Sequence, residues 1–116
     1  LNFLKKQIIN AVSLLSKNAI KDICIAYEPL WAIGKDANSA MNSHDVHQTA
    51  LFIRKVFIDL YGQNGKGVKV LYGGSVAPEN CFELVKNGEV DGLLVGHQSL
   101  VPENSVKIIV AISKIR

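Results

Sequence analysis

A single glutamate, Glu28, stands where a short apolar strand is expected to end. The run from Ile23 to Tyr27 is apolar, and Pro29 follows the carboxylate directly. Proline has no backbone donor, so it ends the strand ladder and stiffens the chain that leaves it. Parallel α/β architectures keep their chemistry at the carboxyl ends of the strands. Glu28 is therefore a candidate catalytic base, although a lone strand-end glutamate is most often a solvated or salt-bridged carboxylate.

The segment after Glu28 has the composition of a hinged lid. It passes through Trp31, Ile33 and Gly34 into a polar stretch, residues 35–40, without a regular pattern. Irregular segments that a rigid strand positions often carry binding and catalytic residues. The sequence thus predicts a base on a strand end joined to a lid.

Helical and strand patterns alternate along the rest of the chain. Apolar periodicity predicts helices at about 4–18, 43–61, 78–86 and 103–115, with Asn42 or Ser43 as the cap of the second. Shorter apolar runs predict strands at 23–27, 68–72 and 92–95. This order predicts an α/β fold with parallel strands and crossover helices.

Glycine-containing segments follow the second and third expected strands. They read YGGSV at 72–76 and DGLLVG at 91–96. A phosphate dianion binds best to converging backbone N–H groups at tight turns and helix N-termini. Glycines after strands also serve as plain turns, and for Gly73 and Gly74 alone that interpretation is favoured.

Taken together, these motifs resemble the triosephosphate isomerase family. The segment AYEPLWAIG at 26–34 is similar to the family's catalytic motif, and the two glycine segments resemble its phosphate loops in the same order. The resemblance covers nearly the whole chain but only the C-terminal part of the family's (β/α)₈ TIM barrel. A complete barrel needs about 250 residues, so residues 1–116 are expected to form one partial barrel domain without the N-terminal half. The start at Leu1, directly in a helical pattern, suggests a truncated record.

The resemblance implies an aldose–ketose isomerase of glycolysis and gluconeogenesis. It would interconvert dihydroxyacetone phosphate and glyceraldehyde 3-phosphate through an enediolate, with Glu28 as the carbon base and no cofactor or metal. The family's phosphate-binding backbone amides correspond to Gly34, Ser75, Gly96 and His97. Family analogy also implies a triose phosphate substrate, a cytoplasmic location and a homodimer when full length.

The family's lid and its support correspond to a further set of residues. These are Pro29, Leu30, Trp31, Ile33, Lys35, Ser39 and Tyr72, with the Tyr72 hydroxyl expected to bond the closed lid near Ser39. Two positions depart from the family. The lid tip reads KDANS where TGKTA is common, so a glycine is lost and Asp36 brings a negative charge. His97 replaces a glycine, and its imidazole could add charge or crowd the loop.

The family's catalytic lysine and electrophilic histidine have no match in this chain. His44 and His47 fall early in the second helix and are expected to be solvated. Because catalytic residues that act as a unit are non-additive, the chain alone is expected to be inactive. The alternatives are a non-catalytic remnant of the isomerase and another phosphate-binding βα-barrel enzyme.

Composition excludes several other classes. A net charge of +3 is spread along the chain, which disfavours nucleic-acid binding. No apolar run approaches the ~18 residues of a membrane span, and no signal-peptide pattern opens the chain. Cys24 and Cys81 have no metal-site spacing and are expected to be buried or semi-buried reduced thiols.

Two structural expectations remain. Arg54 and Asp91 could form an ion pair or be solvated independently. The expected strands would leave two open sheet edges.

Overall fold

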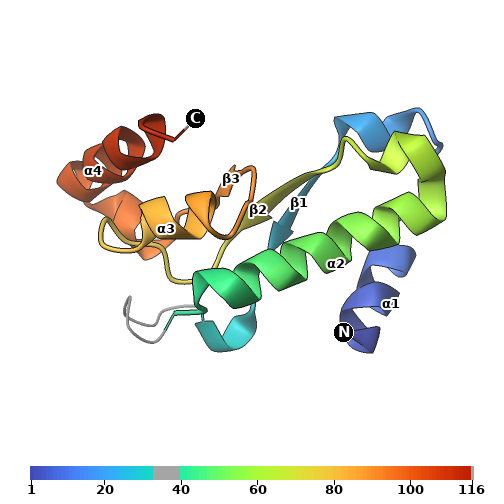
Figure 1. The fold of residues 1–116 in the computed structure, drawn as a ribbon, viewed down its shortest axis with the longest axis horizontal. Helices are drawn as coiled ribbons and strands as arrows, with labels where there is room; N and C mark the ends of the chain where they lie inside the picture. The colour runs from blue at the N-terminus through green and yellow to red at the C-terminus, as the bar shows by residue number, and fades with distance from the viewer. Residues whose placement is uncertain (33–39, 116) are drawn as a thin grey trace.

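The computed structural model describes residues 1–32 and 40–115 and shows helices and strands in alternation (Figure 1). The regular elements are α1 (Asn2–Val12), β1 (Cys24–Tyr27), α2 (Ser43–Tyr61), β2 (Lys69–Tyr72), α3 (Cys81–Lys86), β3 (Gly92–Leu93) and α4 (Pro102–Ser113). In the described residues, 3₁₀ turns accompany them at η1 (Ala19–Asp22), η2 (Leu30–Ala32), η3 (Gly62–Gly65) and η4 (His97–Leu100). The predicted alternation is confirmed.

The strands form one parallel sheet in the order β1-β2-β3. Tyr27 pairs with Tyr72 across the first ladder, and Tyr72 pairs with Leu93 across the second. The long helix α2 crosses between β1 and β2 and lies along the sheet in Figure 1. Parallel strands joined by crossover helices were predicted, and both features are present.

Several element boundaries differ from those predicted. The first helix ends at Val12 because the chain turns there, and the Tyr61 hydroxyl donates to the Val12 carbonyl at 2.8 Å. The third helix begins at Cys81 and not at Pro78, since residues before it form a turn in which the Asn80 side chain accepts from the Ala77 N–H. β3 is only two residues long.

One face of the sheet carries the core. Val70 and Tyr72 of β2 are each only 1% exposed, and Ile53 and Phe57 of α2 are fully buried in the same cluster. The predicted α2 stripe therefore packs on this face, as an amphipathic helix must. Asn42 caps the helix by accepting from the Asp45 N–H at 2.9 Å.

The two cysteines lie in different environments. Both are free thiols; Cys81 is buried, whereas Cys24 is exposed, so the expectation of burial was wrong for Cys24. Burial, the largest influence, raises the pKa of the Cys81 thiol. Within residues 1–32 and 40–115, the helices all lack the combination of length and apolar character that crossing a membrane requires.

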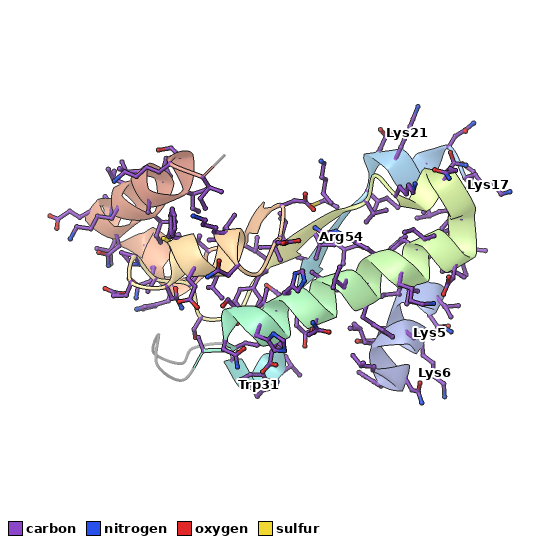
Figure 2. The ribbon with its side chains drawn as sticks, viewed as in Figure 1. Lys5, Lys6, Lys17, Lys21, Trp31 and Arg54 are labelled. Carbon is purple, nitrogen blue, oxygen red and sulfur yellow. The ribbon has the colours of Figure 1, made fainter. Side chains whose placement is uncertain are left out.

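An ion pair joins α2 to the beginning of β3. Arg54 Nη2 lies 3.0 Å from Asp91 Oδ2 and 2.9 Å from the Glu89 carbonyl oxygen, and the same Asp91 oxygen accepts from the Val70 N–H at 2.8 Å. Arg54 is labelled on α2 in Figure 2. The sequence left two alternatives for Arg54 and Asp91, an ion pair or independent solvation, and the structure shows the ion pair. It ties α2, β2 and β3 together at one point.

Two weaker polar contacts lie nearer the start of α2 than the Arg54–Asp91 ion pair. Ser43 donates to Glu83 Oε1 at 2.8 Å, and His47 Nδ1 lies 3.8 Å from Glu89 Oε2. Residues four apart share one helix face, which places these two side chains on the side of α2 that faces α3. His44 is exposed as expected, but His47 is half-buried, and its Nδ1 is buried without a hydrogen bond to any described residue.

The Asp91 network should make stability depend on pH. Burial alone would raise the pKa of Asp91, but the hydrogen bonds from Val70 and Arg54, with the charges of Arg54 and Lys69, lower it below its ordinary value. A lowered carboxyl pKa contributes stability above the unfolded-state value of about 3.9 and loses it as the pH falls through the folded-state value.

We therefore expect Asp91→Asn to lower the free energy of unfolding at pH 7 by about 1–2 kcal/mol. The difference from the wild type should shrink below about pH 4. Urea unfolding of the variant and the wild type at pH 7 and below about pH 4 measures this difference in the free energy of unfolding. Asp59→Asn removes an exposed i,i+4 pair with Lys55 and should cost less than about 0.5 kcal/mol. An Asp91 effect that is equal at both pH values would contradict the assignment.

Candidate active site

Glu28 lies next to the loop that follows β2. The two strands bring it there, because the Gly73 N–H donates to the Tyr27 carbonyl at 2.9 Å, immediately before Glu28. A Cβ atom on Gly73 would lie 2.7 Å from Glu28 Cγ and 3.0 Å from its Oε1. A side chain at 73 would therefore require the Glu28 side chain to shift, and glycine leaves the space that this side chain occupies.

Gly74 makes similar room for the side chain of Tyr72. A Cβ atom on Gly74 would lie 2.0 Å from the Tyr72 hydroxyl oxygen. That oxygen is buried and has no hydrogen bond of good geometry among the described residues; the Met41 backbone influences its pKa without such a bond. Burial, the largest influence, raises the pKa of Tyr72 above its ordinary value. The neutral hydroxyl is therefore the form present at neutral pH.

The loop after Gly74 is tied to the segment after Glu28. The Ser75 hydroxyl donates to the Ala32 carbonyl at 2.5 Å. Asn80 braces the same loop, because its Nδ2 donates to the Ser75 carbonyl at 2.9 Å and its Oδ1 accepts from the Ala77 N–H at 2.8 Å. Sequence reasoning did not single out Asn80. Its place two residues after a proline, before a helix, was a signal for a turn-bracing side chain.

The first residues of the predicted lid lie in and beside the turn η2. The Ala32 N–H donates to the Pro29 carbonyl at 2.9 Å, and both residues are buried. Leu30 and Trp31 between them are exposed, and Figure 2 shows Trp31 beside the start of α2. Buried residues thus anchor the near end of the predicted lid, while the large apolar side chains of Leu30 and Trp31 are exposed to solvent. The predicted site residues Ile33, Gly34, Lys35 and Ser39, and the lid-tip residue Asp36, lie outside the described residues.

The third predicted loop follows β3. The Leu94 N–H donates to the Tyr72 carbonyl at 2.8 Å, which sets the end of β3 beside the end of β2. Gly96 then accepts from the Ser99 N–H and hydroxyl at 3.0 and 2.6 Å, and His97 is exposed at the start of η4. Among residues 1–32 and 40–115, no atom would lie within 4 Å of a Cβ atom on Gly96. The described part of the chain therefore leaves space for a side chain at 96, in contrast to 73 and 74.

A carboxylate at a strand end beside a glycine loop can serve acid–base chemistry. On the neighbouring strand β2, the Tyr72 hydroxyl is buried. In the part of the chain that the structure describes, no group of three His, Cys, Asp or Glu side chains could hold a metal ion.

Comparison with known proteins identifies the family. A sequence model of the family "Triosephosphate isomerase" matches residues 1–112. A triosephosphate isomerase of Thermodesulfovibrio yellowstonii is 40% identical over 109 residues, which cover 94% of this chain and 43% of that protein. One from Endomicrobium trichonymphae is 37% identical, covering 91% and 42%, and one from Moorella thermoacetica is 39% identical, covering 82% and 37%. The chain spans about two fifths of these relatives.

A solved structure agrees with this result. The crystal structure of triosephosphate isomerase from Bartonella henselae superposes with a TM-score of 0.67 at 35% identity, covering 82% of this chain and 36% of that one. The three-stranded parallel sheet with its helices is consistent with part of a (β/α)₈ barrel, so the predicted fold class is confirmed. An unrelated βα-barrel enzyme is no longer a viable alternative. The chain belongs to the triosephosphate isomerase family.

Proposed function

We propose that this chain supplies the carbon base and the phosphate loops of a triosephosphate isomerase. The reaction interconverts dihydroxyacetone phosphate and glyceraldehyde 3-phosphate, as expected for a step of glycolysis and gluconeogenesis. Residues 1–116 act as one partial barrel domain, and activity requires the rest of the barrel. In full length the enzyme is a cytoplasmic homodimer. The relatives' names and the family match support the assignment to the triosephosphate isomerase family.

The contact between Glu28 and Gly73 carries the proposal. It joins the candidate base to the first residue of a glycine loop that follows the neighbouring strand. A carboxylate in that position can remove a proton from a substrate carbon and return it to the adjacent carbon, provided that water is excluded. The exposure of Glu28, Leu30 and Trp31 in this chain means that water reaches the base, which is consistent with an incomplete site.

Backbone amides of four residues are proposed to hold the substrate phosphate: Gly34, Ser75, Gly96 and His97. Asn80 supports this role for Ser75, because its side-chain amide bonds both the Ser75 carbonyl and the Ala77 N–H and so fixes the loop. The Ser75 hydroxyl, which donates to Ala32, then links the phosphate loop to the near end of the lid. Residues Pro29, Leu30, Trp31, Ile33, Lys35 and Ser39 form the proposed lid and its hinges.

The proposal is tested with a chain that restores the missing part. The N-terminal portion of the Thermodesulfovibrio relative is joined genetically to this chain, and isomerase activity is assayed beside this chain alone. We expect the joined protein to be active and the single chain to be inactive, because Glu28 alone has no electrophile to stabilise an enediolate. A folded joined protein that binds inorganic phosphate without interconverting substrate would favour the non-catalytic remnant.

In the joined protein, Glu28→Gln should lower kcat by at least about 10²-fold, since an amide cannot accept the substrate proton. Steady-state kinetics in both directions measure the loss. Glu79→Gln is the matched control, because it makes the same change on an exposed residue of the turn before α3. If Glu28→Gln and Glu79→Gln have equal activity, Glu28 is not the base.

Gly73→Ala should act through the position of Glu28. The added methyl group would fall 2.7 Å from Glu28 Cγ and push the carboxylate aside. We expect kcat to fall at least about tenfold in the joined protein, because small displacements of a catalytic group are costly. Gly67→Ala is the control, since a Cβ there meets none of the described residues within 4 Å. Equal kcat values for the two variants would show that Glu28 does not depend on Gly73.

The buried Tyr72 hydroxyl is proposed to bond the closed lid near Ser39. A buried hydroxyl without a partner is costly, so a bond formed on closure would favour the closed lid. Tyr72→Phe should therefore raise KM for the triose phosphate in the joined protein by about threefold or more, with the fold unchanged by far-UV circular dichroism. Tyr61→Phe, far from β2's carboxyl end, serves as the control. An unchanged KM for Tyr72→Phe would refute this role.

A further inference from the structure

Gly96 and His97 begin a loop that is loosely packed in the described part of the chain. A Cβ atom on Gly96 would meet none of the described residues within 4 Å, and the His97 side chain is exposed. Within residues 1–32 and 40–115, the backbone N–H groups of these two residues donate no hydrogen bond. Both donors are therefore available to a ligand, and polar contacts from neighbouring elements decide where they lie.

The first turn of α4 holds this loop through two side chains. Asn104 Nδ2 donates to Gln98 Oε1 at 2.6 Å. The Ser105 hydroxyl donates to the Ser99 carbonyl at the longer distance of 3.4 Å, and the Ser99 hydroxyl donates to the Gly96 carbonyl at 2.6 Å. Gln98 and Asn104 are both half-buried, so water competes with their bond less than it does at an exposed pair. The bond between Asn104 and Gln98 is thus the shorter and better shielded link from α4 to the loop.

A repeat in the sequence sets two asparagines at matching positions. The segment SVAPEN at 75–80, after β2, is followed by SLVPEN at 99–104, after β3. Asn80 precedes α3, and its side chain bonds main-chain groups of its own loop. Asn104 lies within the first turn of α4, and its side chain bonds the side chain of Gln98. Gln98 therefore provides in the loop after β3 the contact that the main chain provides in the loop after β2.

We propose that Gln98 and Asn104 are positioning residues, which hold the backbone amides of Gly96 and His97 where these bind the substrate phosphate. The inference rests on the proposed function, in which those amides are phosphate donors. Converging N–H groups bind a dianion best when they are fixed before binding, because ordering a mobile loop reduces the affinity. Neither side chain touches the substrate, so their loss should affect binding more than the chemical step.

The variants Gln98→Met and Asn104→Leu remove the bond while they nearly preserve side-chain volume. Both are made in the joined protein, singly and together, and a phosphorus NMR titration with inorganic phosphate gives the dissociation constant. We expect each single variant to raise this constant and the KM for triose phosphate by about threefold or more, with kcat within about twofold, because one neutral hydrogen bond is lost. The double variant should bind phosphate no more weakly than either single variant, since one bond connects the two side chains.

Gln63→Met and Asn64→Leu are the matched controls. Both residues are exposed in η3, which precedes β2 at the end of the sheet opposite the glycine loops, so the dissociation constant and KM should stay within about twofold. Circular dichroism shows whether each variant retains its helix content. Gln98 lies outside α4, so Gln98→Met tests the bond even if Asn104→Leu disturbs the helix. Unchanged phosphate affinity in Gln98→Met, or losses that multiply in the double variant, would overturn the inference.

The titration also separates this inference from the proposed function. If the unsubstituted joined protein binds phosphate without interconverting substrate, the proposed function fails, while the phosphate constants of the variants still decide the roles of Gln98 and Asn104. If the unsubstituted protein interconverts substrate and the variants leave its phosphate affinity unchanged, the positioning roles alone are refuted. An unsubstituted protein that binds no phosphate would refute both.

Discussion

The parallel pairing of β1 with β2 is the constraint on which the candidate site depends. Tyr27 stands opposite Tyr72, and the Gly73 N–H bonds the Tyr27 carbonyl, so the ladder continues to the last residue before Glu28. A slip of one residue would turn every side chain of the strand to the other face of the sheet. Tyr72 would leave the core, and Glu28 would lose its place beside Gly73. The register therefore positions both the core and the candidate site.

The same sheet is held at its other end by a charged group. Asp91 accepts from the Val70 backbone and from Arg54, so one carboxylate sets β2, β3 and α2 relative to one another. Partly buried carboxylates with several donors keep their charge and become structural clamps. In this chain the clamp lies where the strands begin, and the glycine loops lie where they end. The stabilising ion pair and the candidate site thus lie at opposite ends of the same strands, which is the division seen in parallel barrels.

The glycine loop after β2 shows how close packing limits the choice of residue. The Glu28 and Tyr72 side chains occupy the space beside Gly73 and Gly74, whereas a Cβ atom on Gly96 would meet none of the described residues within 4 Å. This contrast gives a physical account of His97 as well. The third loop leaves room for side chains, and a histidine after Gly96 lies exposed without displacing the core. A histidine at 73 would have no such room.

The sequence by itself determined the family, the order of helices and strands, the parallel connection and the identity of the candidate base. These follow from local patterns: apolar periodicity, the proline after Glu28 and three motifs in one order. Only the tertiary structure decided that Arg54 pairs with Asp91, that the Ser75 hydroxyl bonds the Ala32 carbonyl, that Cys24 is exposed and that the first helix ends at Val12. Those features depend on contacts between residues far apart in the chain, and no local pattern encodes a distance of that kind.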